Sequence, residues 1–238
     1  MQSIAAMQSI AYTYSEPLVH IEFLLDCMKE ARKAGIANVL VSNGCINPEA
    51  AQEVLEFTDA ANIDLKCFSE ETYNKVLGGD LGAVTAFIRM AVEKGVHVEL
   101  TTLVVPGLND SEAELGMCRD FIAELETSSA IVPWHLSAYH PDYKWAAIPT
   151  APPATDPGRL LQAAKRAREK LSFVYTGNIA GSKGEYNFTD TYCPACGETL
   201  VGRKGYRIDL SGMPLRQEKG KLSYFCGHCE KPVTVFKV

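Results

Sequence analysis

Apolar runs and amphipathic helical patterns alternate along the first three quarters of the chain, and this alternation limits the folds that are open to it. The runs expected to form strands are residues 9–14, 37–42, 62–65, 96–105, 131–139 and 173–175. The patterns between them begin at proline or capping residues, and several end at glycine, as helices do. Strands that alternate with helices form a parallel sheet, because a parallel connection is long enough to contain a helix.

The predicted fold class is therefore α/β. The strands are near-continuous in apolar residues, so we expect a partial (β/α) barrel over residues 1–176, with a doubly wound sheet as the alternative. Residues 177–191 are rich in glycine and polar side chains and are predicted to be a linker. Residues 192–238 are then a small C-terminal module.

Two Cys-x-x-Cys pairs stand in this module: Cys193 with Cys196, and Cys226 with Cys229, with 29 residues between the pairs. Four thiolates at this spacing converge on one tetrahedral ion, and Zn²⁺ suits this donor set. The strand-like residues between the pairs predict a zinc ribbon with a structural or docking role, because four thiolates leave no open position for a substrate. A rubredoxin-like iron site and four free buried cysteines are the alternatives.

Polar residues also follow several predicted strands at the point where each strand ends. They are Glu16, Asn43, Asp64, Lys66 and His135. In parallel α/β folds the carboxyl ends of the strands meet at one edge, where function gathers. Asp64 and Lys66 are two residues apart and face the same side of a strand. The pattern predicts a binding site at this edge.

Each of these residues also has a structural interpretation. Asp64 and Lys66 would form a structural ion pair, which is costly to bury unless it is well satisfied. Glu16 would only cap a helix. His135 would be a hydrogen-bonded core histidine beside Trp134. Their shared position at one edge is what favours a site.

Composition and charge limit the compartment and the partners that we expect for this chain. Eight cysteines without a secretory signal favour a reducing compartment, and we expect a cytoplasmic protein. The net charge of −6 argues against nucleic acid and anionic membranes as partners, and no run reaches the roughly 18 apolar residues of a membrane span. The cysteines outside the pairs lack ligand spacing and are interpreted as packing residues: Cys27, Cys45, Cys67 and Cys118.

Several motifs, in their order along the chain, resemble those of the radical S-adenosylmethionine (SAM) enzymes akin to pyruvate formate-lyase activating enzyme. They are residues 12–17 (YTYSEP), 41–44 (VSNG), 63–66 (IDLK), 104–110 (VVPGLND) and 133–135 (PWH). Residues 192–197 (YCPACG) resemble one branch, the AmmeMemoRadiSam system radical SAM enzymes. The resemblance covers nearly the whole chain.

The resemblance implies a partial barrel that binds SAM and a [4Fe–4S] cluster. It implies reductive cleavage of SAM to a 5′-deoxyadenosyl radical, which abstracts a hydrogen atom from a partner protein. It assigns SAM-binding roles to Ser15, Glu16 and Pro17 at the amino group, Ser42 and Asn43 along the site, Asp64 and Lys66 near the carboxylate, and His135 at the adenosyl part. No side chain is assigned a catalytic role.

One part of the family pattern is missing from the sequence. The Cys-x-x-x-Cys-x-x-Cys motif that would hold the cluster is absent, and no other cysteine replaces it by spacing. Residues 1–5 repeat at once as residues 7–11, and this second copy runs into the first predicted strand. We therefore expect that Met1 is not the natural start, that the first units of the barrel are missing, and that this chain alone does not cleave SAM.

Two other functions remain open from the residues alone. An aldolase-type lyase would use Lys66 as a Schiff-base amine. A binding module would dock a protein or a nucleic acid through the ribbon, since residues 190–238 carry 8 Lys and Arg against 5 Asp and Glu.

Overall fold

The computed structural model describes residues 8–127, 130–179, 188–205, 207–218 and 221–233. It divides into two compact units, Met1–Thr101 and Thr102–Val238, and each unit is described by itself. The boundary falls inside strand β4 (His97–Val104), which contributes to both units. None of the helices in the described ranges combines the length and the apolar character that a membrane span requires.

Strands β1 to β6 form one sheet in sequential order, as repeated β-α-β connections produce. The strands are β1 (Ser9–Tyr12), β2 (Ala37–Ser42), β3 (Ala60–Asp64), β4, β5 (Trp134–Ala138) and β6 (Val174–Gly177). The registered pairs β1–β2, β2–β3, β3–β4 and β5–β6 are parallel. The predicted α/β class and parallel sheet are confirmed, whereas the barrel remains a prediction.

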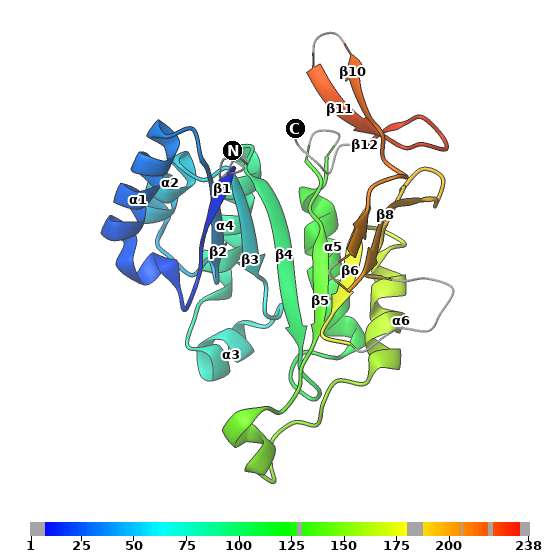
Figure 1. Ribbon diagram of the computed structural model, residues 1–238. Coiled ribbons are helices and arrows are strands. Elements are labelled where there is room, and N and C mark those ends of the chain that lie inside the picture. Colours follow the sequence, from blue (N-terminus) through cyan, green and yellow to red (C-terminus); the bar gives the residue numbers. More distant parts are fainter. Residues whose placement is uncertain (1–7, 128–129, 180–187, 206, 219–220, 234–238) are drawn as a thin grey trace. The chain divides into compact units, whose positions relative to one another are not determined.

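The first unit contains strands β1 to β4 and the helices that connect them (Figure 1). These helices are η1 (Pro17–His20), α1 (Ile21–Lys33), α2 (Pro48–Glu56), α3 (Glu70–Thr72), η2 (Tyr73–Leu77) and α4 (Leu81–Glu93). Helix α1 packs against β2 and α2, and α2 packs against α4. The fully buried side chains of Leu40, Ile63 and Leu100 come from three neighbouring strands and form the centre of the core.

A buried amide fastens the amino end of β2. The Asn38 side chain donates hydrogen bonds to the backbone carbonyls of Met28 (3.0 Å) and Phe57 (2.9 Å), and it accepts one from the Tyr12 hydroxyl (2.9 Å). The three partners belong to β1, α1 and the end of α2. A single buried side chain therefore joins three elements to β2, with its polar atoms satisfied.

The second unit contains β5, β6, α5 (Glu112–Leu125), η3 (Tyr143–Ala147) and α6 (Pro157–Ala167). Ser111 caps α5, because its hydroxyl accepts a hydrogen bond from the Glu114 N–H (3.1 Å). Trp134 is buried and donates from its indole nitrogen to the Thr102 hydroxyl (2.9 Å). The Thr155 hydroxyl donates to the Val104 carbonyl (2.6 Å) and holds the segment before α6 against β4.

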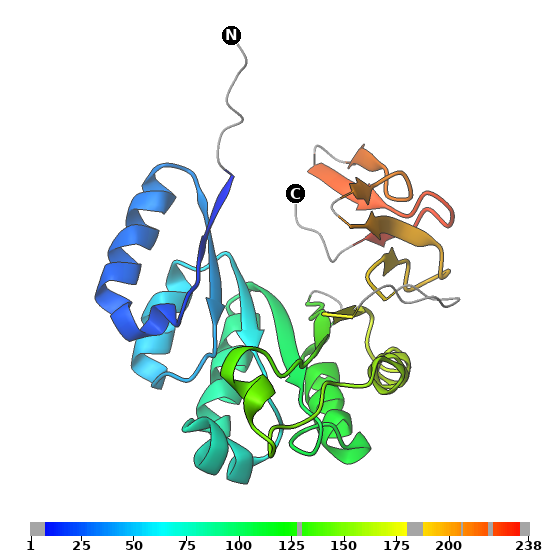
Figure 2. The same ribbon diagram turned by 60° about the horizontal axis from the view of Figure 1, so that its bottom comes forward.

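The C-terminal residues of this unit form what we call the four-cysteine module, residues 191–233. It consists of two three-stranded antiparallel sheets, drawn in brown, orange and red in Figure 2. The strands are β7 (Thr191–Tyr192), β8 (Thr199–Lys204), β9 (Arg207–Asp209), β10 (Leu215–Glu218), β11 (Lys221–Phe225) and β12 (Pro232–Val233). Part of the predicted linker, residues 180–187, lies outside the described residues. The predicted boundaries at 177–191 remain a prediction.

Candidate functional site

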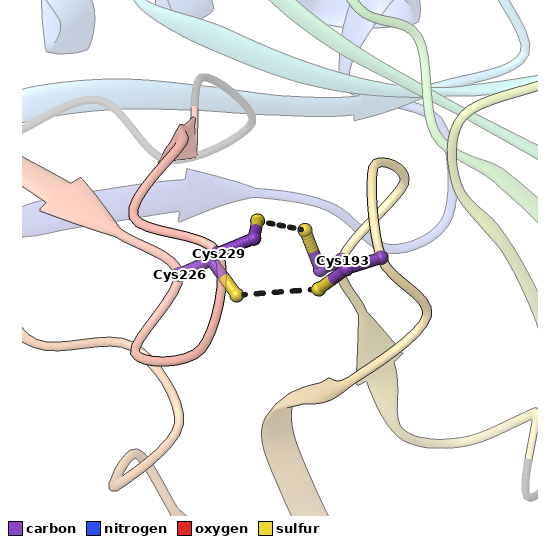
Figure 3. A group of neighbouring side chains, drawn as sticks. Cys193, Cys226 and Cys229 are labelled. Atoms are coloured by element: carbon purple, nitrogen blue, oxygen red, sulfur yellow. Dashed lines mark hydrogen bonds between the residues drawn. The ribbon is translucent and has the colours of Figure 1, made fainter.

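The four paired cysteines come together from two turns of the module. Cys193 and Cys196 lie between β7 and β8, and Cys226 and Cys229 lie between β11 and β12. All four sulfurs lie within 4.8 Å of one another. Cys193 Sγ lies 3.7 Å from Cys229 Sγ, and Cys196 Sγ lies 3.6 Å from Cys226 Sγ. Figure 3 shows Cys193 facing the turn that holds Cys226 and Cys229. All four are free thiols without disulfide bonds.

The spacing of these sulfurs suits one metal ion. Thiolates bound at 2.3 Å around a tetrahedral Zn²⁺ are about 3.8 Å from one another. Two of the sulfur–sulfur distances, 3.6 and 3.7 Å, are close to this value. In a [4Fe–4S] cluster each thiolate binds a different iron, so the four thiolates lie farther apart than around a single ion. The structure therefore contains a four-cysteine metal-binding site whose size fits a single ion.

The two turns share one backbone design. In each, the N–H of the first cysteine donates five residues ahead, and its carbonyl accepts from the residue four ahead. The bonds are Cys193 N to Glu198 O (2.8 Å), Gly197 N to Cys193 O (2.8 Å), Cys226 N to Lys231 O (2.9 Å) and Glu230 N to Cys226 O (3.0 Å). The residue after the second cysteine is left-handed in both turns, with φ of 79° at Gly197 and 60° at Glu230. Glycine adopts this conformation at low cost, and glutamate does not.

Neighbouring thiols shift the pKa of Cys196 and the pKa of Cys226. Burial raises the pKa of the Cys226 thiol, but the N–H groups of Cys229 and His228 and the neighbouring thiols of Cys196 and Cys229 outweigh it and lower the pKa to about 7. The N–H of Glu198 lowers the pKa of Cys196, but desolvation and the three neighbouring sulfurs raise it to about 12. One thiolate therefore forms readily and another forms with difficulty. Four thiolates this close need a cation between them.

A second polar cluster lies at the carboxyl ends of β1 and β2 in the first unit. Oε1 of Glu16 accepts hydrogen bonds from the Ser42 hydroxyl (2.7 Å) and the Leu18 N–H (3.1 Å), and Oε2 accepts from the Asn43 N–H (2.8 Å). Glu16 is thus the cap of η1, as the structural interpretation held. The same carboxylate also bridges to the end of β2, where two more of the predicted residues lie.

Ser42 extends this network to Gly44. The Ser42 hydroxyl donates to Glu16 and accepts from the Gly44 N–H (3.0 Å). Gly44 has a φ of 66°, and a Cβ at this position would lie 3.0 Å from Ile63 and 3.1 Å from Phe87. Both the backbone conformation and the packing therefore require glycine. The turn that presents Asn43 is fixed by the residue next to it.

Asp64 and Lys66 form the predicted ion pair at the carboxyl end of β3, with Lys66 Nζ 2.8 Å from Asp64 Oδ2. The side chains are 34% and 37% exposed, so the pair contributes about 0–1 kcal/mol to stability. The buried Tyr73 hydroxyl accepts a hydrogen bond from the Lys66 N–H (3.1 Å) and positions its backbone. A weak pair in a fixed position suits binding better than it suits stabilisation of the fold.

His135 lies in β5 of the second unit, beside its register partner Tyr175 in β6. The two rings are stacked, with centroids 5.0 Å apart and planes 21° apart. The neighbouring Trp134, not His135, is the deeply buried side chain. Seven of the eight predicted SAM residues thus belong to the first unit and one to the second.

The described residues do not fit a [4Fe–4S] cluster. Cys27 lies in α1 and Cys118 in α5, whereas Cys45 is exposed and Cys67 is buried. Across the described ranges, the four-cysteine module is the only group of three or more metal-ligating side chains. Its sulfur spacing suits one ion, as shown above. Among the described residues there is therefore no set of ligands for a [4Fe–4S] cluster.

Comparison with known proteins identifies a domain in the first half of the chain. A family model described as "Radical SAM superfamily" matches residues 3–115. That range includes the predicted residues at the ends of β1, β2 and β3. The chain thus carries a Radical SAM domain.

The individual relatives extend the match. The uncharacterized protein MJ0808 of Methanocaldococcus jannaschii is 34% identical over 220 residues, which cover 92% of this chain and 61% of MJ0808. Pyruvate formate-lyase 1-activating enzyme of Escherichia coli K12 is 27% identical over 137 residues, which cover 56% of this chain and 54% of that enzyme. The chain is homologous to these activating enzymes, and it spans between half and two thirds of the length of both relatives.

A solved structure agrees with the fold. The crystal structure of a domain of pyruvate-formate lyase-activating enzyme from Bacteroides vulgatus aligns with a TM-score of 0.59, covering 71% of this chain and 99% of that domain. The sequence identity is 20%, so this likeness concerns the fold alone.

Sequence reasoning missed three residues that hold the predicted ones in place. Gly44 fixes the turn at Asn43, Tyr73 fixes the backbone of Lys66, and Tyr175 stacks on His135. Gly44 had a signal, because a glycine just beyond the end of a strand often marks a turn. Tyr73 and Tyr175 had none, because their roles depend on contacts between elements.

Proposed function

We propose that the first unit is the SAM-binding part of a radical SAM enzyme of the activating-enzyme type. The observation that carries this proposal is the arrangement at the ends of β1, β2 and β3, inside the range that the family model matches. There, one carboxylate, Glu16, joins β1 to β2, and the half-exposed Asp64–Lys66 pair follows on β3. In parallel α/β folds this edge is where ligands bind.

The proposed roles follow from which polar groups of each residue are already engaged within the protein. The Glu16 carboxylate is occupied by Ser42, Leu18 and Asn43, so Glu16 shapes the site and its neighbours Ser15 and Pro17 present backbone to the SAM amino group. The half-exposed ammonium of Lys66 attracts the SAM carboxylate.

Three further residues complete the proposed SAM site. Asp64 balances the positive charge on SAM and on Lys66. The Asn43 side chain lines the site next to Ser42. His135 in the second unit is assigned to the adenosyl part by the family resemblance.

Radical chemistry is proposed for the complete enzyme system and not for this chain alone. In radical SAM enzymes an iron–sulfur cluster supplies the electron that cleaves SAM to a 5′-deoxyadenosyl radical. The described residues supply no ligands for that cluster. We infer that this chain binds SAM without cleaving it. The ligands of the iron–sulfur cluster would then be supplied by residues other than those that the structure describes. The hydrogen donor would be a partner protein, as for the activating-enzyme homologues. Assignment to the AmmeMemoRadiSam branch and a cytoplasmic location belong to this proposal.

Direct SAM binding to the full chain, measured by equilibrium dialysis or calorimetry, tests this proposal. Saturable binding of one SAM per chain is expected, and Lys66→Met should weaken it about tenfold, because a charge-assisted contact is lost. Lys75→Met is the matched control, since Lys75 pairs with Glu71 at 2.8 Å on an exposed surface. Equal SAM affinity in the Lys66 and Lys75 variants, or no binding by the wild-type chain, would contradict the proposal.

The geometry does not favour the aldolase alternative. A Schiff-base lysine needs a free amine in an apolar or cationic setting. The Lys66 amine is instead engaged by the Asp64 carboxylate at 2.8 Å. Borohydride trapping of a carbonyl substrate on Lys66 would reopen this alternative.

Docking of an acidic protein segment is the second candidate function. A cavity of about 740 Å³ lies between α6 and the first cysteine turn, and its lining includes Lys165, Arg168 and Lys170 but only one acidic residue, Glu169. Lys170 is paired with Asp120 at 2.8 Å, so the positive charge of this surface comes from Lys165 and Arg168, in a chain of net charge −6. A charge-reversed Lys165→Glu variant should bind an acidic peptide, such as oligoglutamate, at least threefold more weakly than wild type. Unchanged affinity would contradict docking at this cavity.

We propose that the metal in the module is one structural Zn²⁺. Support comes from four thiolate donors, from a sulfur spacing that fits one tetrahedral ion, and from the absence of an open ligand position. Elemental analysis of protein purified without added metal distinguishes zinc from a rubredoxin-like iron.

A further inference from the structure

The four-cysteine module packs against the face of β5 and β6 that carries His135. Side chains alternate between the two faces of a strand, so Tyr175 points to the same side as its register partner His135. Phe173 belongs to the hydrophobic core of the module, and Ile131 and Tyr175 pack against that core. The module therefore covers the part of this face that adjoins His135.

Tyr175 is in contact with His135 on one side and with the module on the other. Its ring stacks on the His135 imidazole at 5.0 Å and 21°. Its hydroxyl shares a hydrogen bond with the Thr191 hydroxyl of β7 (3.0 Å), and the Arg203 guanidinium of β8 lies 5.7 Å from the ring centre. The position of the Tyr175 ring is thus set by two strands of the module.

Those two strands are fixed relative to each other by polar contacts and by the first cysteine turn. Arg203 donates to the Thr191 hydroxyl (2.9 Å) and to the Thr189 carbonyl (2.9 Å), and its backbone N–H donates to Asp190 (2.6 Å). The turn between the strands holds Cys193 and Cys196. Small two-sheet modules of this kind depend on their metal for folding. Loss of the ion should therefore release the contacts that hold Tyr175.

We propose that Tyr175 is a positioning residue through which metal binding in the module sets the orientation of the His135 imidazole. With the ion bound, Thr191 and Arg203 hold the Tyr175 ring, and the stack restricts the imidazole to one orientation. Without the ion, Tyr175 loses both contacts and the imidazole gains other rotamers. A role of this coupling in SAM binding rests on the proposed SAM site, because His135 is the residue assigned to the adenosyl part.

Nuclear magnetic resonance of the full chain with labelled histidines tests the coupling directly. The chain has five histidines, and a His135→Gln variant assigns the signals of His135. Removing the metal with a chelator should shift and broaden the His135 ring signals, while those of His97 in the first unit should not move. Tyr175→Leu should move His135 in the same direction with the metal still bound. Tyr143→Leu is the control, since Tyr143 is 86% exposed.

A milder variant guards against simple misfolding. Thr191→Val removes the hydrogen bonds that the Thr191 hydroxyl makes with Tyr175 and Arg203 and keeps the size of the side chain, so it should give a smaller shift in the same direction at full metal content. If the His135 signals stay the same on metal removal while signals of the module collapse, the proposal is wrong. It is also wrong if both the Tyr175→Leu and Thr191→Val variants leave His135 unchanged.

SAM affinity separates this proposal from the proposed function. Metal removal and Tyr175→Leu should each weaken SAM binding about three- to tenfold, and Tyr143→Leu should leave it unchanged. If no form of the chain binds SAM, the SAM-binding proposal fails, and the histidine signals still decide the coupling. If SAM binds equally well in all forms although His135 moves, Tyr175 does not position a SAM-binding group.

Discussion

The two polar clusters of this protein are held together in different ways. At the ends of β1 and β2, each Glu16 oxygen already accepts hydrogen bonds from the protein, so the cluster keeps its shape without a ligand. In the four-cysteine module the sulfurs mainly face one another, and a cation must hold them together. A cluster that is already hydrogen-bonded is preorganised for reversible binding of a ligand. A cluster of thiolates suits an ion that remains bound.

Metal removal should give the largest effect, and it should be confined to one of the two clusters. Cys226→Ser should lower the metal content from about one ion per chain to near zero and unfold the module, because structural zinc contributes about 10–16 kcal/mol of apparent binding energy to such sites. Metal analysis and amide hydrogen exchange are the measurements. Protection of β2 and β3 should persist. Equal loss of protection in both units would break the comparison.

Gly44→Ala should give the largest effect at the hydrogen-bonded cluster. The left-handed φ of 66° and the close approach to Ile63 and Phe87 together should lower the free energy of unfolding of the first unit by about 2–4 kcal/mol. Chemical denaturation measures this change. Metal content should be unaffected. A change below about 0.5 kcal/mol would show that this turn is not strained by a side chain.

Glu16→Gln should have a smaller effect on the same cluster. The amide keeps one acceptor oxygen but turns an NH₂ group toward a donor, either the Asn43 N–H or the Ser42 hydroxyl. We expect a loss of about 1–3 kcal/mol. SAM affinity should fall together with stability if Glu16 shapes the SAM site as proposed. Glu49→Gln, an exposed change in the first turn of α2, is the control and should alter neither quantity.

Glu230→Gly should produce the smallest effect, and it should be stabilising. Glu230 occupies the left-handed position that Gly197 fills in the other turn, at a cost of about 1–2 kcal/mol. The exposed contact with Arg216 at 3.3 Å offsets little of this. After allowance for the greater freedom of glycine in the unfolded chain, the gain should be about 0.5–1 kcal/mol in the metal-bound module. The reciprocal Gly197→Glu change should destabilise the module, and a gain from both substitutions would refute the shared design of the turns.

The sequence was most informative where structure follows from local patterns. Residues 37–42 were predicted as a strand and form β2, because a short apolar run with β-branched residues favours a buried strand. The four cysteines met as predicted, because their spacing implies the turns that hold them. Strand ends were less accurate: residues 9–14 were predicted as a strand, but β1 ends at Tyr12, since the chain turns to bring Glu16 to its cap position. Asp64 and Lys66 are paired at 2.8 Å, as the structural alternative for these residues expected, while their binding role remains a prediction.

Contacts between elements were beyond sequence reasoning. Nothing local marks Asn38 as the amide that joins β1, α1 and α2, because its partners stand 10, 19 and 26 residues away. Tyr175 was interpreted only as part of a strand, and its contacts with Thr191 and Arg203 depend on how the module packs. Short helices such as η2 and η3 were missed because they are too brief to show a period.

The unequal exposure of the four thiols has a consequence for how the metal exchanges. Cys193 and Cys226 are buried, whereas Cys196 is exposed. Chelators and oxidants therefore reach the ion first at the Cys196 sulfur, and release proceeds stepwise from that side. The rate at which added cadmium replaces the bound ion should depend on access to this one sulfur, while the equilibrium affinity depends on all four. The site should therefore bind its ion tightly at equilibrium and still exchange it through the exposed Cys196 sulfur.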